Sequence, residues 1–284
     1  QALLNYGYSV CNLYIDENKE SLPSLSVEGG VEDGVPVKYQ GEFRYLDMQG
    51  SALEQMERRK KHMRAWIARM TEDNIDQSAI EKAGEILKNG GLAAFPTETV
   101  YGLGGNALDA KASEKIYAAK GRPSDNPLIV HIGRMEDLET VAANVPESAR
   151  RLAAACWPGP LTMIFEKTDA VPLETTGGLT SVAVRYPSNK VANALILAGG
   201  GFIAAPSANT SGRPSPTKAE HVIEDLGDKI DCIIDGGDAE IGLESTIVDF
   251  TEEIPTILRP GYYNKEMLEK VLGTVRVDPG ILAE

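Results

Sequence analysis

The chain has 284 residues, of which 42% are hydrophobic and 25% charged, and its formal net charge is −14. This composition excludes a wholly disordered chain and allows one large domain or two small ones. The acidic balance argues against a protein that grips DNA or RNA through many phosphates, because such binding needs basic residues. No apolar run approaches the roughly 18 residues of a membrane span. The three cysteines lack metal-ligand spacing, and so sparse a set suits a reducing cytoplasm.

Residues 1–70 contain no motif that we can connect to a reaction. Residues 1–50 are predicted to be loop-rich, because glycines and prolines interrupt short apolar runs. Apolar residues then recur at helical spacing and predict an amphipathic helix over residues 51–70. Its basic stretch Arg58–Lys61 could dock on a partner, or the helix could simply pack on its own domain. We therefore treat residues 1–70 as an unassigned N-terminal extension.

From residue 75 onward, short apolar strands alternate with amphipathic helices, which predicts an α/β fold. The first helix is expected to begin with the capping box Ser78–Glu81, and the first strand spans Leu92–Phe95. The short link after Phe250 indicates some antiparallel pairing. Further strands are predicted over 128–132, 161–166, 182–185, 202–205, 232–234, 246–250 and 256–258. Further helices are predicted over 109–119, within 134–155, and over 190–197, 218–226 and 266–271.

The most informative stretch is Ala94-Phe-Pro-Thr-Glu-Thr-Val-Tyr-Gly-Leu-Gly104. Its strand stops at Pro96, and hydroxyls, a carboxylate and a phenol follow at once. In open α/β sheets, ligands bind at such strand exits. Two cations, Lys120 and Arg122, follow the next predicted helix. They could merely interact with the dipole of that helix, or they could bind a polyphosphate, Arg through its planar fork and Lys as a point charge.

Two further side chains are candidates on their own. His131 lies inside an apolar strand, where it is either a satisfied core residue or part of a binding pocket. No second histidine lies at metal-ligand spacing, so we exclude a zinc site. Arg185 directly follows buried apolar residues and suits a carboxylate clamp. No Walker sequence or dinucleotide fingerprint occurs, so any phosphates must be held by side chains and scattered backbone amides.

From about Ile75 to Val271 the sequence resembles the YrdC/Sua5 family of threonylcarbamoyl-AMP synthases. The motifs that carry the resemblance stand in the family's order: Pro96-Thr-Glu-Thr-Val-Tyr-Gly-Leu103, Lys120-Gly-Arg122-Pro123, Asn126-Pro-Leu-Ile-Val-His131, Trp157-Pro-Gly-Pro-Leu-Thr162, Ser181-Val-Ala-Val-Arg185, Ala205-Pro-Ser207-Ala-Asn209, Glu244-Ser245-Thr-Ile247 and Arg259-Pro-Gly261.

The resemblance implies a YrdC-like twisted, mixed parallel and antiparallel sheet flanked by helices, with a large concave cavity. Residues 71–273 would be the catalytic domain, and residues 274–284 a tail or the start of a linker. The implied reaction makes L-threonylcarbamoyladenylate from L-threonine, bicarbonate or CO2, and ATP, with release of pyrophosphate. ATP would be a substrate, accompanied by Mg²⁺. A separate transferase would use the product to form N6-threonylcarbamoyladenosine at position 37 of tRNA.

The resemblance also implies the site residues. Those expected at L-threonine are Thr97, Tyr101, His131, Arg185, Ala205 and Ser245. Those expected at ATP are Lys120, Arg122, Asn126, Ser181, Ser207, Asn209, Ser215 and Arg259. Lys120 and Arg122 would be catalytic, because they could balance the charge that develops at the α-phosphorus. Glu244 and Asp235 are the acids that we expect near a magnesium ion.

Two other functions stay open. One is a carbamoyl-adenylate enzyme of another pathway, like the related domain of hydrogenase-maturation carbamoyltransferases, whose acylphosphatase and zinc-finger regions we do not find in this sequence. The other is a non-catalytic RNA-binding member of the fold, which the acidic charge disfavours. We expect no tight nucleic-acid binding, no membrane partner and a cytoplasmic location. Whether the chain is a short family form or part of a longer one is left open.

Overall fold

The computed structural model describes residues 27–32, 35–39 and 65–280, and the chain divides into two compact units, Gln1–Lys61 and His62–Glu284. In the first unit, strands β1 (Val27–Glu32) and β2 (Val35–Tyr39) pair antiparallel. The loop-rich prediction is therefore wrong for these residues, because valines at short spacing favour strands more than the intervening glycines oppose them. The rest of residues 1–50 lies outside the described residues.

Strand β3 (Trp66–Arg69) corrects the helix predicted over residues 51–70. It pairs parallel with β11 (Cys232–Asp235), Trp66 opposite Cys232 and Arg69 opposite Asp235. Local spacing indicated a helix, whereas a partner strand far along the sequence decides the structure. Residues 66–69 thus belong to the sheet of the second unit, and the predicted domain start at residue 71 falls just after this strand. Residues 51–64 of the predicted helix lie outside the described residues.

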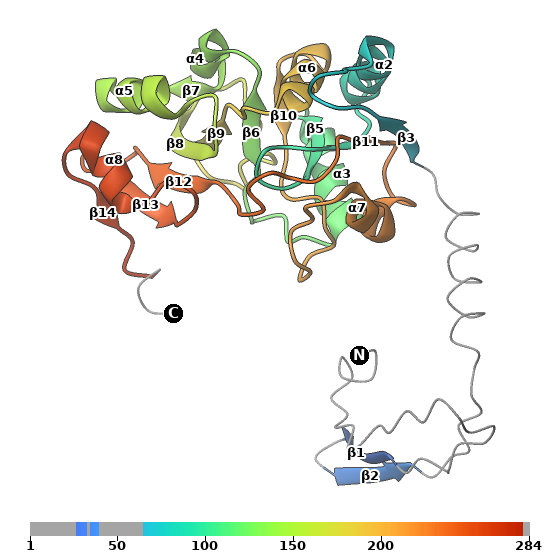
Figure 1. Cartoon of the computed structure of the whole chain (residues 1–284). Coiled ribbons are helices and arrows are strands. Elements are labelled where there is room, and N and C mark those ends of the chain that lie inside the picture. Colours follow the sequence, from blue (N-terminus) through green and yellow to red (C-terminus); the bar gives the residue numbers. More distant parts are fainter. Residues whose placement is uncertain (1–26, 33–34, 40–64, 281–284) are drawn as a thin grey trace. The chain divides into compact units, whose positions relative to one another are not determined.

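One mixed sheet of 12 strands organises the second unit (Figure 1). Its order is β14-β13-β12-β8-β9-β6-β10-β5-β4-β11-β3, and β7 pairs with β8. The strands not yet given are β4 (Ala93–Phe95), β5 (Gly102–Asn106), β6 (Ile129–Ile132), β7 (Ala142–Ala143), β8 (Leu161–Lys167), β9 (Ser181–Arg185), β10 (Phe202–Ala204), β12 (Thr246–Asp249), β13 (Thr256–Arg259) and β14 (Arg276–Val277). The sheet contains parallel pairs such as β6–β9 and antiparallel pairs such as β8–β9, and β12 and β13 form the predicted antiparallel pair after Phe250. The predicted mixed α/β fold is confirmed.

Helices flank the sheet on both sides (Figure 1). They are α2 (Gln77–Lys88), α3 (Ala110–Lys120), α4 (Leu138–Val141), α5 (Glu147–Cys156), α6 (Lys190–Ala198), α7 (Ala219–Leu226) and α8 (Lys265–Leu272), with a 3-10 turn at Met135–Asp137. In Figure 1, α2 and α6 lie above the sheet and α3 and α7 below it. Within the described ranges, none of these helices has both the length and the apolar character that crossing a membrane requires.

Helix α2 begins two residues earlier than the predicted capping box implied. Asp76 is its N-cap, and the Asp76 carboxylate accepts a hydrogen bond from the backbone N–H of Ala79 at 3.1 Å. Ser78 donates its hydroxyl to Asp76 at 2.8 Å instead of capping the helix itself. Asp76 is the N-cap in place of Ser78 because the charge of a carboxylate strengthens its hydrogen bonds to the exposed N–H groups of the first turn.

The central strands are buried on both faces, which explains their continuous apolar sequence. In β4, Phe95 packs with α2 and α6, whereas the neighbouring Ala94 packs in the cluster that holds residues of α3 and α7. Helices α2 and α6 approach so closely at Gly84 that a Cβ there would lie 2.6 Å from the backbone of Ala198. The two layers hold β4 rigidly, and the site begins where this strand ends.

Strand β5 was missed because its sequence, Gly-Leu-Gly-Gly-Asn, resembles a loop. It lies between β4 and β10, and a Cβ at Gly104 would stand 2.8 Å from the ring of Phe95 and 2.7 Å from Ile203. Glycine is required there because the ring of Phe95 occupies the space that a side chain would fill.

Candidate active site

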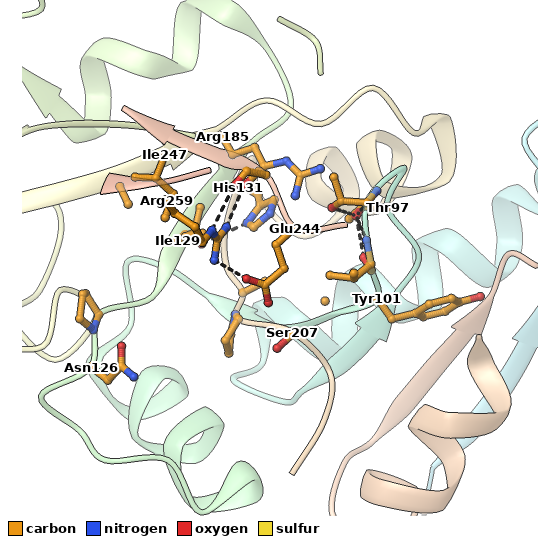
Figure 2. Close-up of a pocket in the computed structure, with 18 of the residues that line it drawn as sticks. Thr97, Tyr101, Asn126, Ile129, His131, Arg185, Ser207, Glu244, Ile247 and Arg259 are labelled. Carbon is orange, nitrogen blue, oxygen red and sulfur yellow. Dashed lines mark hydrogen bonds and ion pairs between the residues drawn. The ribbon is translucent and has the colours of Figure 1, made fainter. Parts of the chain in front are cut away.

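A pocket of about 230 Å³ opens where several strand ends and loops meet (Figure 2). The residues between β4 and β5 form one wall, and β6, β9 and the exit of β10 form the floor. The loop after α3, the start of β12 and the end of β13 complete it. The predicted site residues that line this pocket are Thr97, Tyr101, Arg122, Asn126, His131, Arg185, Ala205, Ser207, Ser245 and Arg259. Lys120, Ser181, Asn209 and Ser215 are not among its lining residues.

The hydroxyl of Thr97 is occupied by the turn that follows β4. It donates to the carbonyl of Val100 at 2.6 Å and accepts the backbone N–H groups of Thr99 and Val100, each at 3.2 Å. These bonds fix the chain direction after Pro96. The hydroxyl predicted to bind substrate therefore already bonds its own backbone.

Thr99 is a pocket residue that the sequence reasoning missed. Its hydroxyl lies 2.9 Å from the hydroxyl of Thr97. Because Thr97 donates its one proton to Val100, Thr99 must be the donor in this contact, and the oxygen of Thr99 keeps lone pairs that can accept. The spacing Thr-x-Thr indicated two hydroxyls close together. It did not show which of them bonds the backbone of the turn and which is available to a ligand.

Tyr101 lines the pocket, but its ring points away from the other labelled side chains (Figure 2). Its hydroxyl donates to the carbonyl of Gly237 at 2.6 Å and accepts the N–H of Gly236 at 3.2 Å. Burial raises the pKa of this phenol. These two bonds tie the loop that leads from β11 toward Glu244 and Ser245 to the residue directly before β5.

Arg185 ends β9 and is 4% exposed, and its guanidinium donates to the carboxylate of Glu98 at 2.7 Å. His131 lies opposite Arg185 on the neighbouring strand β6. Burial, and then the charge of Arg185, lower the pKa of His131 to about 3. The ring is thus neutral near pH 7, and its Nδ1 donates to the carbonyl of Ile129 at 3.1 Å.

Ser245 and Arg259 belong to one network at the start of β12. Arg259 donates to the Ser245 hydroxyl at 3.0 Å and to the carboxylate of Glu244 at 2.6 Å. Ser215 donates to the other oxygen of the Glu244 carboxylate at 2.7 Å. Glu244 therefore joins two residues predicted at ATP, and in this way Ser215 reaches the pocket without lining it.

Arg122 is held by hydrogen bonds to the loop that follows it. It donates to the Asn126 side chain at 2.6 Å, and to the carbonyls of Asn126 and Pro127 at 3.2 Å each. Burial lowers its pKa, although the guanidinium keeps its charge at any ordinary pH. Across the described ranges, no carboxylate lies within ion-pair distance of Arg122.

Lys120 is 1% exposed and lies behind the pocket, in contact with the loop after β10. Its ammonium donates to the carbonyls of Ser207 and Asn209, each at 2.5 Å. Burial is the main cause that lowers the pKa of Lys120 to about 8, and the charge of Arg122 adds to it.

Ser181 lies at the opposite end of β9 from Arg185. The rise of a strand puts about 13 Å between these two residues.

The comparison with known families agrees with this arrangement. The sequence profile of a family described as telomere recombination, with the members Sua5, YciO and YrdC, matches residues 85–261. The chain belongs to this Sua5/YrdC family.

Within the Sua5/YrdC family, the chain is 53% identical over 209 residues to a threonylcarbamoyl-AMP synthase of Pyrococcus abyssi (strain GE5 / Orsay), covering 74% of this chain and 62% of that protein. It is 49% identical over 218 residues to the threonylcarbamoyl-AMP synthase of Bacillus subtilis (strain 168), covering 76% and 63%. The crystal structure of P. abyssi Sua5 complexed with L-threonine matches with a TM-score of 0.75 and 50% identity, covering 78% of this chain and 64% of that one. The chain thus spans slightly less than two thirds of the length of these relatives.

A magnesium site built by the protein does not fit the Sua5/YrdC pocket. Glu244 is the one acid among the described lining residues, and both of its oxygens are already bonded. Asp235 lies at the end of β11 in an ion pair with Arg69, at 3.3 Å. No group of three potential metal ligands gathers anywhere in the described ranges.

Proposed function

We propose that this chain makes L-threonylcarbamoyladenylate from L-threonine, bicarbonate or CO2, and ATP, and releases pyrophosphate. Relatives that carry the name threonylcarbamoyl-AMP synthase, at up to 53% identity, support the proposal. The solved structure of P. abyssi Sua5 complexed with L-threonine supports the choice of amino acid. The observation that carries the proposal is the uneven distribution of charge around the pocket.

Two of the arginines that line the pocket are neutralised, and one is not. Arg185 pairs with Glu98 and Arg259 with Glu244, at 2.7 and 2.6 Å. Arg122 has no such partner within the described residues, and the buried ammonium of Lys120 lies behind Ser207 nearby. The Arg122 end therefore favours a strongly anionic group such as a triphosphate. The Arg185 end suits a zwitterion, whose own charges cancel.

At the Arg185 end we place threonine. The guanidinium of Arg185 would bind the carboxylate, and the free lone pairs of Thr99 would accept from the nitrogen or hydroxyl of the substrate. Ser245 and Ala205 also line the pocket. Neutral His131 adds no second positive charge to this end. ATP would occupy the end lined by Arg122, Asn126, Ser207 and Arg259.

The chemistry that this pocket would perform needs no covalent nucleophile. The neutral amine of threonine attacks the carbon of CO2, a C–N bond forms, and the nitrogen loses its proton to solvent or bicarbonate. One carbamate oxygen then attacks the α-phosphorus of ATP, and the bond to the pyrophosphate oxygen breaks. A free carbamate collapses quickly, so the protein contributes by holding both partners together and excluding water. Arg122 would stabilise the charge that moves onto the phosphates.

The product is an activated acyl adenylate that another enzyme must consume. We place that step with a separate tRNA threonylcarbamoyl transferase, which forms N6-threonylcarbamoyladenosine at position 37. Sparse cysteines support a cytoplasmic location for this work. In the proposal, Mg²⁺ arrives with the phosphates of ATP, because magnesium usually binds through substrate phosphates and water.

A pyrophosphate-release assay tests the proposal. Release should require ATP, bicarbonate and L-threonine together, and L-serine should be a poorer substrate because it lacks the methyl group. Mass spectrometry should find the threonylcarbamoyl adenylate. Release that is equally fast without any amino acid would contradict the proposal, and use of carbamoyl phosphate in place of threonine would favour a carbamoyl-adenylate enzyme of another pathway.

A further inference from the structure

The two cations of the motif Lys120-Gly-Arg122 point to different places. The side chain of Arg122 lines the pocket, whereas that of Lys120 is buried beneath it, between α3 and the loop after β10. Besides its two bonds to the carbonyls of Ser207 and Asn209, the Lys120 ammonium contacts the side-chain oxygen of Asn209 at 3.3 Å. The backbone carbonyl of Lys120 also accepts the N–H of Ser211 at 2.9 Å. Side chain and main chain of this one residue thus tie the loop to the end of α3.

Asn209 completes the connection and has no free hydrogen-bonding atom in its side chain. Its amide nitrogen donates to the carbonyls of Thr210 and Arg213, at 3.0 and 2.7 Å. Its amide oxygen accepts from Lys120 and, at 2.6 Å, from the hydroxyl of Ser207. Since Ser207 lines the pocket, the position of its hydroxyl is set by a buried group that the pocket does not reach.

We propose that Lys120 and Asn209 are positioning residues, which fasten the Ser207 loop to helix α3 and do not contact the nucleotide themselves. The proposal differs from the direct phosphate contact that the resemblance suggested for Lys120. The three acceptors around the ammonium saturate its three protons, so none is left for a phosphate oxygen. The consequence for nucleotide binding rests on the proposed function, whereas the fastening of the loop can be tested without it.

A buried ammonium without a carboxylate partner is costly, and its retention needs a reason. Among the described residues, no acid forms an ion pair with Lys120. Carbonyl dipoles replace the lost water only in part, since burial depresses the pKa of Lys120 to about 8. A neutral side chain would avoid this cost but could not satisfy three oxygens converging from one loop. The ammonium is therefore suited to closing a loop, and its charge still raises the potential at the Arg122 end.

The first test labels lysines in the unaltered protein with an amine-reactive ester, with and without ATP, and reads each site by mass spectrometry. Lys120 should react at least about 10-fold more slowly than exposed Lys111 in both states, because reaction requires local opening. ATP should not change the rate at Lys120 beyond any general slowing. A Lys120 that reacts readily in the free protein and is protected by ATP would overturn the proposal.

The second test compares Lys120→Met with Lys115→Met. Lys115 lies on the same helix, is exposed, and donates to the carbonyl of Gly90 at 2.5 Å, away from the pocket. In Lys120→Met, hydrogen exchange at the amides of residues 207–211 should be at least about 10-fold faster, while Lys115→Met leaves it unchanged. The affinities for AMP and for ATP should fall by similar factors, because the loop is displaced and no phosphate contact is lost. Unchanged exchange with a selective loss of ATP affinity would contradict the proposal.

Discussion

Arg185 and Glu98 form a buried ion pair in which each partner keeps one polar atom without a hydrogen bond. Their side chains are 5% and 6% exposed, and Nη2 and Oε1 lie 2.7 Å apart. Within the described part of the chain, Nε of Arg185 and Oε2 of Glu98 are buried and have no partner. Incomplete satisfaction of a buried charged pair is typical of a site prepared for a ligand. Arg185 is thus held by Glu98 and still has a donor free.

Replacement of Glu98 by the similarly shaped glutamine should therefore destabilise the protein strongly. Glu98→Gln keeps the shape of the side chain but leaves the Arg185 charge unpaired, so we expect a loss of about 3 kcal/mol in the free energy of unfolding. Urea unfolding measures it. The control Glu85→Gln breaks an exposed pair with Lys88 on α2 and should cost less than about 1 kcal/mol. Equal effects of the two substitutions would show that the buried pair is not a special feature.

Truncation should reveal that the second unit begins before residue 70. A protein that starts at His62 keeps β3, whereas one that starts at Met70 loses Trp66–Arg69 and leaves β11 paired with β4 alone. We expect the shorter protein to be less stable by at least about 2 kcal/mol, because Ala68 and the apolar residues of β11 lose buried contacts. Thermal unfolding of both proteins measures the difference. Identical melting temperatures would contradict the assignment of β3 to the core.

The sequence predicted the fold class and most of the pocket because those signals are local. Polar residues directly after apolar strands indicated Thr97 and Arg185 as candidates, and the family motifs added Ser207 and Ser245. Prediction from the sequence failed at β3 and β5, because residues distant in the sequence determine these two strands. Trp66 pairs with a strand near residue 232, and Gly104 is glycine because of the ring of Phe95.

Side-chain orientation was the other part that could not be predicted. Thr97 and Thr99 have the same chemistry, and only the turn geometry shows that Thr97 serves the backbone while Thr99 keeps a free lone pair. Lys120 and Arg122 are two residues apart at a helix end, where a small difference in direction buries one and leaves the other at the pocket. Charge and spacing alone cannot resolve such differences, because they depend on packing around each side chain.

His131 should leave a signature in the pH dependence of stability. Its pKa is about 3 in the folded protein against an ordinary 6.5, so the unfolded chain binds a proton that the folded chain refuses. The folded protein should therefore lose stability as pH falls from about 6.5 to about 3. His131→Gln lacks this effect. As the pH falls over that range, the free energy of unfolding of the variant should therefore rise relative to that of the wild type. Urea midpoints measured at several pH values test it, and parallel curves would contradict a depressed pKa.

Arg122 should be the residue whose loss most reduces turnover while leaving the fold intact. It lines the pocket, it has no carboxylate partner among the described residues, and no phosphate loop exists to replace it. A donor that acts on transition-state charge is worth roughly 3–4 kcal/mol, so Arg122→Ala should lower kcat about 100-fold or more. Arg122→Lys should recover only part of this, because an ammonium lacks the two-pronged geometry of a guanidinium.

The matched control for that prediction is Arg150→Ala, which removes an exposed arginine that pairs with Glu139 and does not line the pocket. It should change pyrophosphate release by less than about twofold, since exposed pairs contribute little. Circular dichroism and the melting temperature establish that each variant is folded. If Arg122→Ala keeps both near-normal turnover and near-normal ATP affinity, this arginine has no role in binding or catalysis. The phosphates must then bind elsewhere in the pocket, where Arg185 and Arg259 are the other lining arginines.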